Sequence, residues 1–337
     1  ATLQRHKAAY NMALTSVPTN IYDTPPVNSP VLDFAGGDLD EPGMRGRTRT
    51  QGVLLTDTLG LLDDNVLLTL GTRHQKVVTR EYNYGDETEI TRSRFGKSRW
   101  TPAYGVMVKP WQHISLYANH IEALQPGKTA AKTEDNNGGS TDVIHSKQNE
   151  VGVKIDYQRV GGSLALYEIK LPSAIVNANK DFVLDGEQRN RGLELNLFGE
   201  PLLGLRINGS ASWIDARLTS TANGTHDGNK AVGVPNYNMV LGAEYDIQPL
   251  EGLTATALVN HGGAQYVDPA NTKKLDSHTT LDLGVRYRMK VQENDMVWRV
   301  GVDNVTNENY WAAVDNSSTY ITRGEPRTLK VSMSYDF

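Results

Sequence analysis

Apolar and polar residues alternate one by one at the end of the chain. Leu329, Val331, Met333, Tyr335 and Phe337 are separated by Lys330, Ser332, Ser334 and Asp336. Successive side chains of an extended strand point to opposite faces. Residues 329–337 are therefore predicted to form a strand with one apolar face and one polar face.

The same alternation recurs through the chain. It is clear in segments 151–157, 193–197, 205–213, 239–247, 281–289 and 298–303. Four earlier segments, 46–60, 66–82, 96–109 and 111–122, follow it less regularly but still indicate strands. Helical spacing at i, i+3 and i+4 fits none of these windows better. The chain is predicted to be all-β.

The connections between these strands alternate between short and long. The short ones are 61–65, 109–111, 158–162, 199–204, 247–252 and 290–295. The long ones lie at 15–45, 83–95, 123–144, 173–186, 218–231, 267–277 and 307–324, and they are rich in Asn, Gly, Asp, Thr and Ser. Outer-membrane barrels have short periplasmic turns and longer external loops. We therefore predict an antiparallel transmembrane outer-membrane β-barrel, with about 14 strands in seven hairpins and both termini on the short-turn side.

Aromatic residues lie where an interfacial girdle is expected. Trp111 and Phe198 are at short turns, and further aromatics near the periplasmic strand ends are Tyr157, Tyr245, Tyr287, Tyr335 and Phe337. Trp213 and Trp298 are expected on the lipid-facing side of their strands.

Composition narrows the function classes. The 337 residues include no cysteine, which excludes disulfides, cysteine-ligated metals and thiol catalysis. The net charge of −5 and the lack of a long basic run argue against a nucleic-acid partner. No apolar run approaches the roughly 18 residues of a transmembrane helix.

Catalytic patterns are missing from the sequence. The eight histidines have no metal-binding spacing, and Ser277-His278 beside Asp276 lies in a polar loop where such residues are common. We therefore expect no enzyme activity, no catalytic residue, no metal site and no protein-bound cofactor.

Six segments, in order along the chain, resemble TonB-dependent siderophore receptors. They are YANHIEALQPG (117–127), SKQNEVGVKID (146–156), RNRGLELNLFGEP (189–201), LDLGVRY (281–287), VDNVTNENYW (302–311) and GEPRTLK (324–330). The resemblance runs from about residue 46 to residue 337 and leans toward ferrichrome or hydroxamate receptors.

This resemblance implies a 22-stranded barrel in the outer membrane of a Gram-negative cell, with an N-terminal plug in its lumen. No plug and no signal peptide are visible in the sequence. We therefore expect residues 1–337 to be the C-terminal portion of the barrel domain, with the plug outside this chain. One alternative is a self-contained, porin-like passive channel of about 14 strands. Another is an outer-membrane enzyme or a soluble β-rich binding module.

The function implied is binding and import of a ferric siderophore. The siderophore supplies its own iron ligands, so the receptor contributes shape, aromatic faces and hydrogen bonds. Candidate ligand-binding residues at the loop-side strand ends are Tyr82, Tyr84, Trp100, Tyr310, Trp311 and Tyr320. The alternative for each is an upper aromatic girdle.

The expected partners are the ferric siderophore, the TonB complex through a missing N-terminal region, and outer-membrane lipid or lipopolysaccharide. Charged residues predicted to face the lumen, where they contact a plug or hydrate the interior, are Lys154, Asp156, Glu194, Arg286, Arg288, Arg299 and Asp303.

Overall fold

The computed structural model describes residues 2–9, 12–14, 34–36, 44–82, 95–130, 133, 135–314 and 320–336. Its main feature is a 14-stranded sheet in which every neighbouring pair is antiparallel. The strands in spatial order are β1 (Thr2–Ala9), β4 (Met44–Leu61), β5 (Val66–Glu81), β6 (Phe95–Trp111), β7 (Ile114–Gln125), β10 (Ile144–Tyr157), β11 (Val160–Val176), β12 (Phe182–Leu202), β13 (Leu205–Ser220), β14 (Tyr237–Asp246), β15 (Leu253–Gly262), β18 (His278–Val291), β19 (Asn294–Asp303) and β22 (Thr328–Tyr335). Spatial order follows chain order, so the sheet is a meander.

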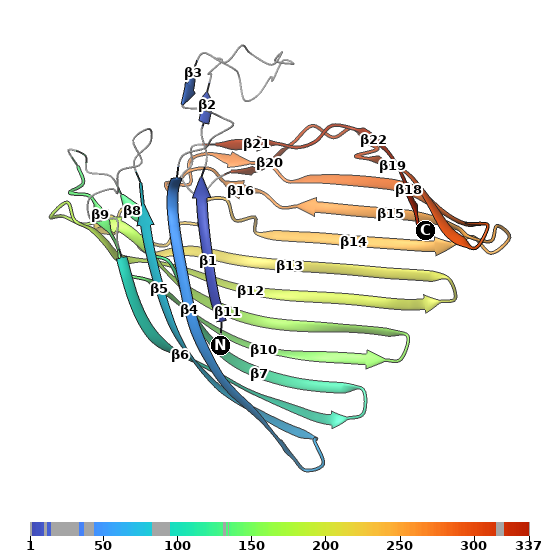
Figure 1. Cartoon of the computed structure of the whole chain (residues 1–337), viewed down its shortest axis with the longest axis horizontal. Coiled ribbons are helices and arrows are strands. Elements are labelled where there is room, and N and C mark those ends of the chain that lie inside the picture. The colour runs from blue at the N-terminus through green and yellow to red at the C-terminus, as the bar shows by residue number, and fades with distance from the viewer. Residues whose placement is uncertain are drawn as a thin grey trace.

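Four two-stranded ribbons accompany the large sheet. They are β2 (Met12–Leu14) with β3 (Phe34–Gly36), β8 (Thr129–Ala130) with β9 (Gly139–Ser140), β16 (Gln265–Tyr266) with β17 (Lys274–Leu275), and β20 (Trp311–Val314) with β21 (Ile321–Arg323). A single 3₁₀ turn, η1, spans Ala222–Gly224 in the described part of the chain. Figure 1 shows the sheet curving, with the ribbons gathered at one end and the short turns and the C-terminus at the other. The all-β, 14-strand prediction is confirmed.

The two faces of the sheet differ in polarity. Strand register places Leu166, Leu193 and Trp213 side by side on one face, which we call the outer face. Glu194 and Ser212 are opposite each other on the inner face. Large apolar side chains of the outer face are exposed throughout the sheet, while very few apolar side chains are fully buried. This is the reverse of a water-soluble sandwich, whose apolar faces pack against each other.

No helix among the described residues has the length and apolar character needed to cross a membrane.

Several predicted connections differ from the structure. The turn expected at 109–111 lies at 112–113, and the turn expected at 199–204 shrinks to 203–204 because β12 continues to Leu202. The long loop expected at 173–186 is wrong. There, β11 and β12 continue to pair out to Val176 and Phe182, which leaves only 177–181 as the connection.

Most of the predicted girdle residues lie on the outer face. Trp111 is exposed at the last position of β6, and Trp213 and Trp298, which were predicted to face lipid, are on the outer face and well exposed. Phe198 is different, because it shares the inner face with Glu194 and its ring covers Gly161. Phe337 lies outside the described residues.

Candidate functional site: the inner wall and the loop rim

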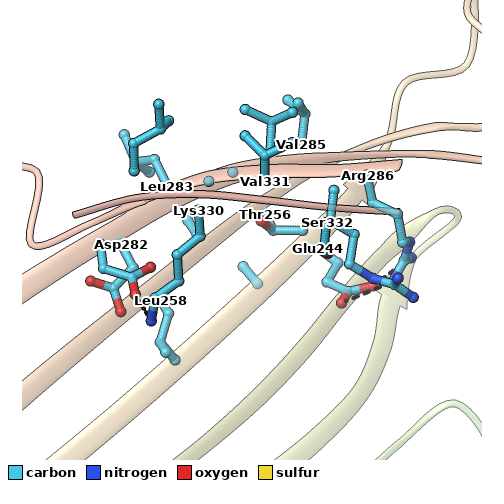
Figure 2. Close-up of a pocket in the computed structure, with 18 residues that line it drawn as sticks. Glu244, Thr256, Leu258, Asp282, Leu283, Val285, Arg286, Lys330, Val331 and Ser332 are labelled. Atoms are coloured by element: carbon cyan, nitrogen blue, oxygen red, sulfur yellow. Dashed lines mark hydrogen bonds and ion pairs between the residues drawn. The ribbon is translucent and has the colours of Figure 1, made fainter. Parts of the chain in front are cut away.

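The inner wall formed by the C-terminal strands β14, β15, β18, β19 and β22 carries a group of charged side chains. It lines a hollow of about 860 Å³. Figure 2 shows Leu283, Val285 and Val331 pointing to one side of these strands, while Glu244, Arg286 and Lys330 point to the other. The polar side therefore presents paired charges to the inner space.

Glu244 of this wall belongs to a network of ion pairs that extends to β13. The guanidinium of Arg206 donates to Asp246 at 2.6 Å and to Glu244 at 3.3 Å, and Arg286 donates to the same Glu244 at 2.9 Å. The hydroxyl of Thr254 donates to Asp246 at 2.8 Å. Bidentate arginine–carboxylate contacts fix geometry as well as charge. The network thus presents paired charges on the inner face.

A second polar group lies on the inner wall formed by β7 and β10. The hydroxyl of Tyr117 donates to Glu150 at 2.6 Å, and the ammonium of Lys154 lies 5.0 Å from the centre of the Tyr117 ring. The ring itself covers Gly152, where an added Cβ would lie 2.7 Å from it. Glycine at position 152 is what allows the ring to lie flat against the sheet.

At the loop rim, one aromatic stack fixes the segment between β19 and β22. The rings of His278 and Tyr310 are stacked with their centres 4.1 Å apart and their planes at 18°. The Tyr310 ring also covers Gly324, whose amide donates to the Tyr310 carbonyl at 2.9 Å. Burial raises the pKa of the Tyr310 hydroxyl above its ordinary value.

Asn304 anchors the base of the same segment. Its side chain is 3% exposed, and its amide nitrogen donates to the carbonyls of Glu308 and Glu325 at 2.9 and 3.0 Å. Its side-chain oxygen accepts from the Glu308 amide at 2.8 Å. A buried amide satisfied in this way is costly to replace, since each lost partner leaves an unpaired group.

Neighbouring external segments are tied to one another. Asn271 accepts from the backbone amide of Lys230 at 2.8 Å and donates to its carbonyl at 3.0 Å, as a paired strand residue would. Gln265 is 4% exposed and donates to the carbonyl of Ala312 at 3.2 Å. Segments 221–236 and 263–277, together with the described residues 304–314 and 320–327, thus form one connected block at the rim.

The structure brings only some of the predicted ligand residues together. Tyr310 and Trp311 are consecutive in that block, and Tyr320 follows in the same segment with 69% of its surface exposed. Tyr82 is half-buried directly after β5, away in sequence from the other three. Tyr84 lies outside the described residues.

Trp100 is on the outer face. It is opposite His74 on β5, with ring centres 4.9 Å apart, and is 56% exposed. This position favours the girdle interpretation of Trp100 over contact with a ligand inside the barrel.

The predicted lumen charges do face inward. Register places Lys154 opposite Ser163, Glu194 opposite Ser212, and Arg286 opposite Arg299, all on the inner face. Sequence reasoning missed the residues that fix the rim, namely His278, Asn271, Gln265 and Asn304. Each has a partner 21 to 47 residues away, and no local pattern indicates such contacts.

Within the described ranges, no three acidic or histidine side chains lie close enough together to hold a metal ion.

Comparison with known proteins gives a consistent result. Residues 5–305 match the family model described as "TonB dependent receptor-like, beta-barrel". The chain is 48% identical, over its whole length, to the ferrichrome receptor FcuA of Yersinia enterocolitica, of which it covers 45%. It is 28% identical, over 81% of its length, to the ferrichrome outer membrane transporter/phage receptor of Escherichia coli K12, of which it covers 36%.

Among solved structures, the ferric preacinetobactin receptor BauA from Acinetobacter baumannii superposes with a TM-score of 0.78. The two are 37% identical, and the match covers 95% of this chain and 47% of BauA. The chain thus spans less than half the length of each of these three proteins.

Proposed function

Because the chain belongs to the TonB-dependent receptor-like β-barrel family, we propose that it is the C-terminal portion of a receptor barrel that imports a ferric siderophore. Members of this family are transport receptors rather than enzymes, and the protein lies in the outer membrane of a Gram-negative cell. Lipid covers the apolar outer face, and the charged inner face lines the lumen.

The observation that carries the proposal is the 48% identity to a ferrichrome receptor along the entire chain. It favours a hydroxamate siderophore as the ligand. The ferric ion is part of the transported substrate and is bound by the siderophore's own oxygens. The protein contributes contact area and hydrogen bonds at the rim.

Tyr310, Trp311 and Tyr320 are the ligand residues that we propose at the rim. Aromatic side chains give large contact area at a low entropy cost, and the stack on His278 holds Tyr310 in place before a ligand arrives. Tyr82, directly after β5, stays a candidate, and so does Tyr84, which lies outside the described residues. We assign Trp100 to the aromatic girdle and not to the ligand site.

We propose that the plug domain contacts the inner-wall network around Glu244. Because its charges are already paired and oriented, a plug carrying polar groups would bind it without reordering the wall. Energy for moving the plug would come from TonB, through a segment outside this chain.

Uptake of iron tests the proposal directly. The complete protein is expressed in a Gram-negative strain that lacks its own siderophore receptors, and radioactive iron is supplied as ferrichrome, ferrioxamine B or a catecholate complex. We expect uptake from a hydroxamate complex in a TonB-positive strain and none in its TonB-negative counterpart. No uptake from either siderophore class would refute the transport function.

The 14 strands of the sheet favour one second candidate, a passive channel. A passive channel would conduct ions in planar bilayers and would move solutes equally well with and without TonB. The receptor proposal predicts no ion conduction in planar bilayers, and it predicts transport that requires TonB.

A further inference from the structure

The external end of the β7–β10 hairpin separates from the wall of the sheet. In the ladder that the structure describes, β7 pairs with β6 up to Ile121, opposite Ala103, whereas β6 itself continues to Phe95 in its ladder with β5. β7 and β10 stay paired with each other beyond that point. We call the described residues 122–130 and 135–147 the inner flap.

The inner flap lies on the inner face of β5 and β6. Register counted across the sheet from Leu166 of the outer face puts the odd-numbered residues of β5 and β6 on the inner face. Two of these, Gln75 and Val77, are buried, with 8% and 1% of their surface exposed. Val77 packs with Leu124 and Val143 of the flap, and the side-chain amide of Gln75 donates to the Leu124 carbonyl at 3.5 Å. The flap therefore covers this part of the wall on its lumen side.

One histidine of the flap contacts the wall with one ring nitrogen and the flap with the other. Nδ1 of His145 lies 2.6 Å from a guanidinium nitrogen of Arg99 on β6, and Nε2 lies 2.7 Å from a carboxylate oxygen of Glu122 on β7. Arginine can only donate a hydrogen bond, and an ionised carboxylate can only accept one. Nδ1 must therefore accept and Nε2 must donate, which is the neutral ring in a single tautomer.

A second proton on His145 would break the contact between flap and wall. It can go only to Nδ1, where the N–H would point at the guanidinium of Arg99. Two cations at hydrogen-bond distance with no acceptor between them repel each other. The hydrogen bond to Glu122 would remain, because Nε2 donates in both states. Protonation thus acts on the link to the wall and leaves the link inside the flap in place.

Other charged groups around this histidine do not reverse the effect. The ammonium of Lys147 lies 3.4 Å from Glu122 and adds a further cation to the flap. The ring nitrogens of His120 face Glu122 and the side-chain oxygen of a β10 asparagine, and both can accept, so a proton on His120 would have a partner. Lys97 of the wall pairs with Asp142 of the flap, in an ion pair that involves no histidine.

We propose that His145 and Arg99 form a pH-sensitive latch. The latch keeps the inner flap on the wall near neutral pH and releases it in acid, which uncovers the inner face of β5 and β6 to the lumen. Histidine is the side chain whose charge ordinarily changes in this range. The inference rests on the packing of the hairpin end and is independent of the identity of the transported ligand.

The test measures access to the wall beneath the flap in the complete protein, reconstituted in nanodiscs. The chain has no cysteine of its own, so Val77→Cys introduces one thiol into it at the covered position. Thr69→Cys, on the same strand and the same face but outside the flap, is the reference. The rate of maleimide labelling at Val77→Cys is divided by the rate at Thr69→Cys, which removes the effect of pH on thiol reactivity. Peptide mass spectrometry identifies the labelled position.

We expect this ratio to rise roughly tenfold between about pH 7.5 and about pH 5, as for the loss of one hydrogen bond to a charged group. In a His145→Gln background the ratio should stay low at both pH values, since the amide can still accept from Arg99 and donate to Glu122 but takes up no proton. In an Arg99→Met background it should be high at both. His113→Gln, at a short turn, is the matched control and should respond to pH as the wild type does.

Three results would overturn the proposal. The first is a ratio that does not change with pH in the wild-type background. The second is an acid response in His145→Gln as large as in the wild type, and the third is loss of that response in His113→Gln. Heat-resistant migration on gels verifies that each variant is folded.

Discussion

Single glycines determine where aromatic rings can lie in this sheet. Tyr117 covers Gly152, Tyr167 covers Gly192, and Tyr310 covers Gly324. In each case the ring occupies the space that a Cβ would need, so the glycine and the ring form one unit. Strand register brings the first two pairs together, and a backbone hydrogen bond from Gly324 to Tyr310 joins the third.

Gly324→Ala tests this unit at the rim. The new methyl group would collide with the Tyr310 ring, and overpacking of this kind costs about 1–3 kcal/mol. We expect weaker siderophore binding and faster hydrogen exchange across 304–327. Gly242→Ala is the matched control, because its nearest neighbours are 3.6 Å away and nothing needs to move. Equal effects of the two substitutions would argue against the ring–glycine unit.

Asp268 makes one external segment sensitive to acid. It accepts from the hydroxyl and amide of Thr272 and from the amide of Lys273, and the Thr272 hydroxyl contributes most to lowering the pKa of Asp268. A lowered pKa in the folded state means that the carboxylate stabilises the segment above the unfolded value of about 3.9, and that this stabilisation disappears as the pH falls below it.

We therefore expect the amides of Thr272 and Lys273 to lose protection from hydrogen exchange below about pH 4, relative to a strand amide of β18. In Asp268→Asn the protection should be low at every pH. Protection that stays constant down to pH 3 in the wild type would contradict this role for Asp268.

At the scale of elements, hairpins extend further than the alternating pattern indicates. The β11–β12 ladder continues through Pro172–Glu187 to Val176–Phe182, where the sequence is mixed in polarity. Alternation requires lipid on one side and water on the other. Where a hairpin rises above the membrane, both sides are wet and the pattern disappears, although the backbone ladder continues. That is why a loop was expected at 173–186.

The same reasoning explains what the sequence could indicate about the candidate site. Inward-facing residues such as Lys154 and Glu194 follow from the alternation, and their positions are confirmed. The rim contacts of Asn271 and His278 join separate hairpins, so neither periodicity nor turn chemistry predicts them. Phe198 was assigned to a girdle from its position near a turn, whereas its place in the alternation assigns it to the inner face.

Asn271→Ala should separate two of the rim segments. The change removes both hydrogen bonds to the Lys230 backbone and leaves that amide and carbonyl unpaired, at a local cost of about 1–3 kcal/mol. We expect increased proteolysis within 221–236 and 263–277, with little change in the stability of the barrel strands. Asn309→Ala, in the neighbouring segment, serves as the control. A fall in global stability equal to the local effect would show that the rim is not a separate unit.

For the whole molecule, the difference between the two faces determines which substitutions the membrane tolerates. Leu195 is on the outer face and Asn196 is next to it on the inner face, in the same strand and at the same depth. Leu195→Arg should cost about 2–4 kcal/mol if that depth is near the bilayer midplane, whereas Asn196→Arg should cost little. Unfolding from lipid vesicles measures both. Equal costs would mean that lipid does not cover the outer face.

The meander order of the strands has a consequence for how the chain can be divided. None of the described residues between 126 and 143 belongs to the large sheet, and in the part of the chain that the structure describes the strands on the two sides meet through the β7–β10 pair. A break in this connection would leave every strand of the large sheet intact, with one complementary edge on each piece. If the complete protein is divided at this connection and the two pieces are expressed together, they should reassemble in the membrane through the β7–β10 pair. The amount of heat-resistant barrel recovered would measure this reassembly.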